Sequence, residues 1–214
     1  PIYDSDNLGF YFYNGSEWLY PNFFIENPNR ISFNILDAVI SPSNNGDIFI
    51  ANYGGWNEAF NGFFKLIYDK AINEIRFEKF YPSQDRSRAV GLVYDDQSNL
   101  FATSSYDNTT ERTIYYVFDK SAEVFKGRIV ARGAAQKPIY NEGSLYIPTP
   151  RQNEFVSVNL NNTTQNINDD VVTLLNSSNG FPGNCTGNLS PTIDKSNDLC
   201  IGNDNELRIL RNAS

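Results

Sequence analysis

The sequence predicts an all-β fold, because short aromatic-rich strands alternate with polar turns and this arrangement recurs four times along the chain. The chain has 214 residues, of which 40% are hydrophobic and 14% are aromatic, mostly Phe and Tyr. Aromatic residues of this kind favour strands, and the apolar fraction is large enough for a packed core. We therefore expect a folded, β-rich chain.

The four copies share one order of segments: an apolar strand, a polar turn, a second strand and an aromatic or aliphatic third strand. The second strand marks each copy most clearly, and it reads Ile48-Phe49-Ile50-Ala51, Leu100-Phe101-Ala102-Thr103, Leu145-Tyr146-Ile147-Pro148 and Leu199-Cys200-Ile201-Gly202. A fourth strand-like segment follows at 75–80, 124–130 and 171–175. Four strands in a period of roughly 40–50 residues are typical of a β-propeller blade.

We therefore predict part of a β-propeller, about four and a half four-stranded antiparallel blades, with boundaries near residues 30, 84, 133 and 186. The segments 8–13 and 18–24 resemble the last two strands of a preceding blade, so we expect the chain to be a piece of a larger multidomain protein. Phe49, Phe101 and Tyr146 are expected to wedge between neighbouring blades, and Cys200 occupies the same slot in the fourth copy.

The composition excludes several classes of function. A net charge of −8 is unfavourable for nucleic-acid binding, and the absence of His excludes Ser-His-Asp, Cys-His and His-ligated metal sites within these residues. The two cysteines, Cys185 and Cys200, permit either one disulfide or buried thiols. No apolar run is long enough for a membrane-spanning helix. We expect no catalytic residue, no metal and no cofactor.

Several motifs carry a resemblance to a known family. The run Asp198-Leu199-Cys200-Ile201-Gly202 resembles the two-component-regulator propeller repeat of Bacteroidetes, with Cys200 and Glu206 in place of that repeat's Trp and second Gly. The order of the segments 12–18, 35–43, 48–55, 62–66, 88–95 and 167–176 resembles the PorZ-like surface β-propeller proteins of the type IX secretion attachment complex. This resemblance extends over nearly the whole chain.

The resemblance implies an exported protein on the extracellular face of the outer membrane. Members of that family bind anionic lipopolysaccharide and assist the sortase that attaches secreted cargo, together with outer-membrane partners of the complex. A polysaccharide or lipopolysaccharide ligand and a non-catalytic role are thus expected for this chain.

Candidate ligand-binding residues come from two places. The segment 53–61 combines aromatic rings, flexible Gly and amides suited to sugars, and Tyr53, Trp56 and Asn57 are its candidate contacts. Arg86 and Arg88, with Lys126, Arg128 and Arg132 nearby in the same copy, could meet phosphate groups, because guanidinium forks match phosphate oxygens. Tyr106 completes the set. The ordinary alternatives are a packed surface loop and dispersed solubilising charge.

Two other functions remain open. A periplasmic oligosaccharide-sensing propeller of a hybrid two-component system would contain the same repeats. A propeller-fold polysaccharide lyase or hydrolase would need paired carboxylates, for which Asp95-Asp96 and Asp169-Asp170 are the candidates. The spacing Asn166-x-Asn168-x-Asp170 also faintly resembles a calcium loop, although it lacks the Gly and the distal Glu of that motif.

Overall fold

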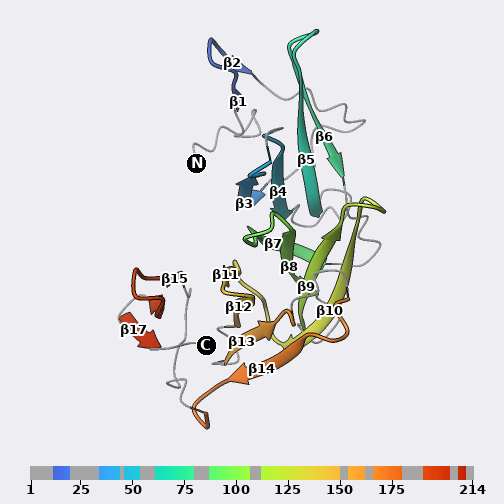
Figure 1. Ribbon diagram of the computed structural model, residues 1–214. Helices are drawn as coiled ribbons and strands as arrows, with labels where there is room; N and C mark the ends of the chain where they lie inside the picture. The colour runs from blue at the N-terminus through green and yellow to red at the C-terminus, as the bar shows by residue number, and fades with distance from the viewer. Residues whose placement is uncertain are drawn as a thin grey trace.

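The computed structural model describes residues 12–19, 34–43, 46–53, 61–79, 87–106, 112–149, 154–161, 166–179, 190–202 and 207–210. Within these ranges every regular secondary-structure element is a β-strand, which confirms the prediction of an all-β fold. Figure 1 shows the sheets following one another in chain order along a curved path. Among the described strands, no sheet closes on itself.

Three four-stranded antiparallel sheets account for most of the structure, and each follows the simple order of the chain. The first sheet contains β3 (Asn34–Ile40), β4 (Ile48–Tyr53), β5 (Gly62–Asp69) and β6 (Glu74–Lys79). The second contains β7 (Ser87–Tyr94), β8 (Leu100–Tyr106), β9 (Arg112–Asp119) and β10 (Val124–Arg132). The third contains β11 (Ile139–Asn141), β12 (Ser144–Thr149), β13 (Glu154–Asn159) and β14 (Val171–Leu175).

A smaller sheet lies at each end of this series. The described residues of the fourth sheet form β15 (Ser190–Ile193), β16 (Leu199–Gly202) and β17 (Leu207–Leu210), and a hairpin of β1 (Phe12–Tyr13) and β2 (Trp18–Leu19) precedes the first sheet. Every pairing is between strands consecutive in the chain. Each repeat copy therefore folds as one sheet.

Polar residues close the turns between first and second strands. In the second sheet, Asp95 Oδ1 accepts hydrogen bonds from the backbone N–H groups of Gln97 and Asn99, at 2.9 and 2.7 Å. In the fourth sheet, Asp194 Oδ1 accepts equivalent bonds from Ser196 and Asp198, at 2.8 and 3.0 Å. These aspartates form Asx turns, which is why the repeat places Asp before its polar turn.

The core lies between the sheets because each second strand presents alternate residues to its two neighbours. In β8, Leu100 and Ala102 pack in the same apolar cluster as Phe49 and Phe63 of the first sheet. The intervening Phe101 packs in the next cluster, with Leu145, Ile147, Val156 and Val158 of the third sheet. Every inner sheet thus buries both of its faces.

The three expected wedges occupy equivalent places. Phe49 faces the second sheet, Phe101 the third and Tyr146 the fourth, and each is at least 94% buried, with exposed fractions of 6%, 1% and 3%. Cys200, at the corresponding position of β16, is a buried free thiol at 7% exposure. Cys185 lies outside the described residues.

The hairpin β1–β2 covers the remaining face of the first sheet. Leu19 packs with Ile50, Leu66 and Ile75, whereas Trp18 on the opposite face of the hairpin is 68% exposed. The rest of the expected strands 8–13 and 18–24 falls outside the described residues. Among those described, no helix has the length and apolar character needed to cross a membrane.

Candidate functional site

The two ends of the strands differ in their connections. At one end of each sheet, tight turns join the first strand to the second. At the other end, the second and third strands are joined by the segments 54–61, 107–111, 150–153 and 203–206. The connections from each sheet to the next also start and finish at this second end, which we call the loop edge.

The structure places the described candidate residues at the loop edge. Tyr53 is the last residue of β4 and pairs with Asn34, and Tyr106 is the last residue of β8 and pairs with Ser87. Arg88 is the second residue of β7 and is partly buried. Strands β4 and β7 contact one another, so these residues belong to neighbouring sheets of one surface. Trp56, Asn57 and Arg86 lie outside the described residues.

A row of hydroxyl groups holds the connection between the second and third sheets at this edge. Thr113 Oγ1 donates to the Gly133 carbonyl at 2.9 Å, and Ser105 Oγ accepts from the Ala135 backbone N–H at 2.8 Å. These hydroxyls come from β9 and β8, so the connection crosses the sheet from its last strand towards its first. Thr103 of β8 continues the row.

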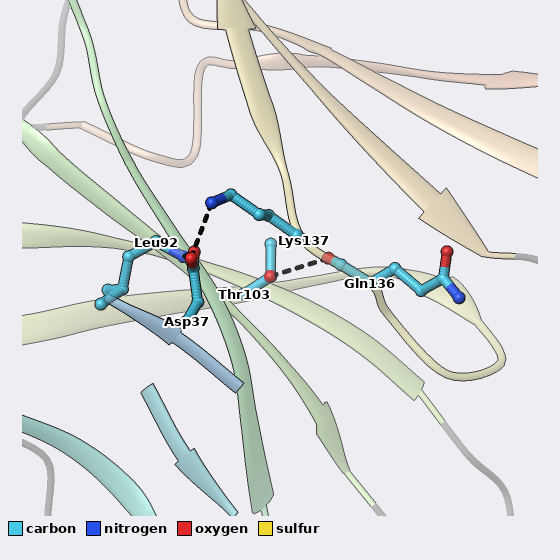
Figure 2. A network of polar contacts seen from close by, with 5 residues as sticks. All are labelled: Asp37, Leu92, Thr103, Gln136 and Lys137. Atoms are coloured by element: carbon cyan, nitrogen blue, oxygen red, sulfur yellow. Dashed lines mark hydrogen bonds and ion pairs between the residues drawn. The ribbon is translucent and has the colours of Figure 1, made fainter. Parts of the chain in front are cut away.

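Figure 2 shows how the row ends in an ion pair that joins three sheets. Thr103 Oγ1 donates to the Gln136 carbonyl at 3.0 Å. The next residue, Lys137, extends its Nζ to 2.6 Å from Asp37 Oδ1 of the first sheet, and Asp37 Oδ2 accepts a hydrogen bond from the Leu92 backbone N–H at 2.8 Å. One carboxylate therefore joins β3, β7 and the segment that leads into β11.

Two β-bulges make this contact possible. The register of β3 on β4 shifts between Ile35 and Asp37, and that of β7 on β8 shifts between Ala89 and Gly91. A bulge adds one residue to a strand and turns a side chain away from its regular face. Asp37 is consequently buried, with 8% of its surface exposed, in the middle of an otherwise apolar strand.

Gly91 allows the third sheet to approach. A Cβ atom at this position would lie 2.6 Å from Lys137 Cα and 2.6 Å from Pro138 Cδ. Atoms cannot pack this closely, so only glycine fits. The bulge of β7 and the segment 137–138 are thus matched in shape as well as in hydrogen bonding.

The acidic residues weighed as candidates for catalysis or metal binding in the alternative functions hold turns and sheets together. Asp95 caps its own turn, and its Oδ2 accepts from Asn99 Nδ2 at 2.8 Å. Asp170 is buried and forms a short hydrogen bond with the Tyr115 hydroxyl of the second sheet. Arg128 donates to the Ile167 and Asp170 carbonyls at 2.9 and 2.8 Å. The segment 166–170 is therefore fixed against β9 and β10.

The environment of Asp170 is unfavourable for a carboxylate. Burial, followed by repulsion from Asp169, raises the pKa of this carboxyl, while the Tyr115 hydroxyl and the Arg128 guanidinium oppose the shift. Its Oδ1 is buried and has no hydrogen-bond partner among the residues that the structure describes. Burial and the neighbouring carboxylate also raise the pKa of Tyr115. The guanidinium beside Asp170 makes the segment a poor cation site.

Of the other basic residues considered with Arg86 and Arg88, two form contacts within the chain and one is exposed. Lys126 pairs with Asp119 at 2.7 Å, and Arg128 is used by the segment 166–170. Arg132 is exposed at the end of β10, opposite Arg112 of β9. Arg112 did not stand out in the sequence, because only the strand pairing places it beside Arg132.

Within the described ranges, His, Cys, Asp and Glu do not gather in groups of three or more that could hold a metal ion. The loop edge carries the guanidinium groups of Arg88, Arg112 and Arg132, a kind of group that suits recognition of a negatively charged ligand. Comparison with protein-family models and with curated proteins found no match for the chain.

Proposed function

We propose that the four sheets are consecutive blades of a β-propeller. Three features support this arrangement: each inner sheet buries two apolar faces, the connection 133–137 crosses from the last strand of one sheet to the first strand of the next, and the first strands meet around Asp37. Such radial stacking places first strands at a common axis.

We further propose that this propeller is a non-catalytic surface module that binds anionic lipopolysaccharide. The observation that carries the proposal is the location of Tyr53, Arg88 and Tyr106 at one loop edge, because binding groups generally lie on connections held by a rigid scaffold. The resemblance to the type IX secretion family supports the same ligand. An outer-membrane location and assistance to the cargo-attaching sortase belong to this proposal.

Binding of the purified chain to immobilised lipopolysaccharide bearing a phosphorylated polysaccharide tests the proposal, with neutral dextran as the reference ligand. Replacing Arg88 by Gln should weaken binding about tenfold, the effect of losing one charge-assisted hydrogen bond. Arg76→Gln is the matched control, because Arg76 is an exposed arginine on the outer strand β6. Thermal melting of each variant checks that the fold is retained.

Two results would contradict the proposal. Equal binding to neutral dextran would show that the ligand need not be anionic. Equal effects of Arg88→Gln and Arg76→Gln would show that the ligand does not bind at the loop edge. The appearance of shortened polysaccharide chains during incubation would instead indicate a lyase or hydrolase.

A further inference from the structure

Two arginines face one another across neighbouring strands of the second sheet. Arg112 begins β9, Arg132 ends β10, and the strand register pairs them directly. Like charges placed opposite one another destabilise a sheet. Both side chains are exposed, and neither forms an ion pair with a carboxylate of the described residues. Two positive charges are thus held side by side in a chain with a net charge of −8.

The arginine pair lies in an open groove of about 600 Å³ between the second and third sheets. Besides Arg112 and Arg132, the groove is lined by Ile129, Val130, Glu154 and Leu174. Ile129 and Leu174 are 52% and 38% exposed, although they are aliphatic. The groove therefore combines two arginines and one carboxylate, and so a net positive charge, with aliphatic surface that is open to solvent.

The chemistry of this groove fits an extended peptide better than a sugar. Among the described residues, its lining contains no aromatic ring on which a sugar could stack. β10 is the last strand of the second sheet, so within the described structure one row of its backbone groups has no strand partner. Edge strands of this kind accept a further extended segment through main-chain hydrogen bonds. Arg132 pairs with Arg112, and Ile129 pairs with Ile114 two residues further along β9, so Arg132 and Ile129 lie on the same face of the sheet. In such a segment, acidic and aliphatic side chains would therefore follow one another along one face, at every second residue.

We propose that this groove docks an extended acidic segment of a partner protein. Carboxylates of the segment bind Arg112 and Arg132, its aliphatic side chains cover Ile129 and Leu174, and its backbone lies along the end of β10. The inference does not rest on the lipopolysaccharide proposal, because it is argued from Arg112, Arg132, Ile129 and Leu174, although Arg112 pairs with Tyr106 where β8 and β9 meet the loop edge.

Fluorescence anisotropy tests the docking with a labelled Glu-Val peptide, in which Glu and Val take turns at every second position and Ser fills the positions between them. A Lys-Val peptide of the same design and length serves as the reference. The Glu-Val peptide should bind the chain, and Arg112→Gln or Arg132→Gln should each weaken that binding about tenfold. Ile129→Ser should also weaken it. Binding should decrease as salt is raised, since the contacts are exposed charge pairs.

Matched substitutions elsewhere provide the controls. Arg76→Gln removes an exposed arginine from the first sheet, and Ile72→Ser removes an isoleucine that is 62% exposed in the β5–β6 turn. Neither should change peptide binding. Equal binding of the Lys-Val peptide, equal effects of the control substitutions, or no binding of the Glu-Val peptide would each overturn the inference.

The lipopolysaccharide assay separates the two proposals. If Arg112→Gln abolishes lipopolysaccharide binding and the Glu-Val peptide does not bind, the groove is a glycan site and the peptide assignment is wrong. If Arg88→Gln leaves lipopolysaccharide binding intact while Arg112→Gln weakens peptide binding, the lipopolysaccharide proposal fails and the docking groove stands.

Discussion

The carboxylate of Asp37 accepts a hydrogen bond from the backbone N–H of Leu92 at 2.8 Å, and so links the first strands of two neighbouring sheets. Leu92 is fully buried, at 0% exposure, and water cannot replace this acceptor. The same carboxylate binds Lys137, whose side chain is 57% exposed. The two contacts of Asp37 should therefore differ in their effect on stability.

Asp37→Ala should lower the free energy of unfolding by about 1–3 kcal/mol, because it leaves a buried N–H without a partner. Lys137→Ala should cost at most about 1 kcal/mol, since exposed ion pairs contribute little. Urea denaturation followed by tryptophan fluorescence measures both changes. An equal cost for the two substitutions would show that the buried hydrogen bond is not the dominant contact.

Gly91→Ala should destabilise the chain by about 1–3 kcal/mol, because its Cβ would meet the backbone of Lys137. The substitution forces the segment 137–138 away from β7 and should weaken the Asp37–Lys137 contact. The combined Gly91→Ala and Asp37→Ala variant should thus lose less stability than the sum of the single variants. Strict additivity in a double-mutant cycle would argue against this coupling.

Phe101→Ala should cost about 3–5 kcal/mol, since it opens a cavity between the second and third sheets. Val124, which is 42% exposed at the start of β10, provides a control within the same sheet, and Val124→Ala should change stability by no more than about 0.5 kcal/mol. Chemical denaturation gives both values. A small effect of Phe101→Ala would mean that the wedge is not central to the junction.

Asp170 should make the chain less stable as the pH rises. Its pKa is raised in the folded state, so the native chain holds this proton more tightly than the unfolded chain does. The contribution of Asp170 is therefore most favourable below the unfolded pKa of about 4 and is lost as pH rises through the folded pKa.

Asp170→Asn removes this titration. Between about pH 4 and pH 7, the variant should lose less stability than the unmodified chain, as measured by urea denaturation at several pH values. Asp169→Asn removes the repulsion, which is the smaller cause of the raised pKa, and should reduce the pH dependence without abolishing it, because the burial of Asp170 remains. Parallel stability profiles for the unmodified chain and Asp170→Asn would refute the expectation.

The strand pattern was predictable because it depends on local alternation. The expected second strand at 145–148 lies within β12, and the expected segment 171–175 coincides with β14. The equivalent burial of Phe49, Phe101 and Tyr146 followed from the same repeat. These features need only the periodicity of a strand and the spacing of turns.

Contacts between sheets were harder to anticipate. Asp37 interrupts the apolar run 35–40, which signals a special role, but its partners Leu92 and Lys137 lie 55 and 100 residues away. Asp170 was weighed as a metal ligand or catalytic acid, whereas the structure turns it towards Tyr115. The Arg112–Arg132 pairing likewise depends on the register of two strands. Sequence reveals the unusual residue in such cases, and the fold decides its partner.

Each inner sheet buries both of its faces, and this affects how the chain folds while it is being synthesised. A sheet that has just formed covers the one before it and leaves its own Phe49, Phe101 or Tyr146 face bare until the following strands are synthesised. During synthesis from the N-terminus, the most recently completed sheet therefore always exposes one apolar face to solvent. Slow or interrupted translation between copies should favour aggregation over partial folding.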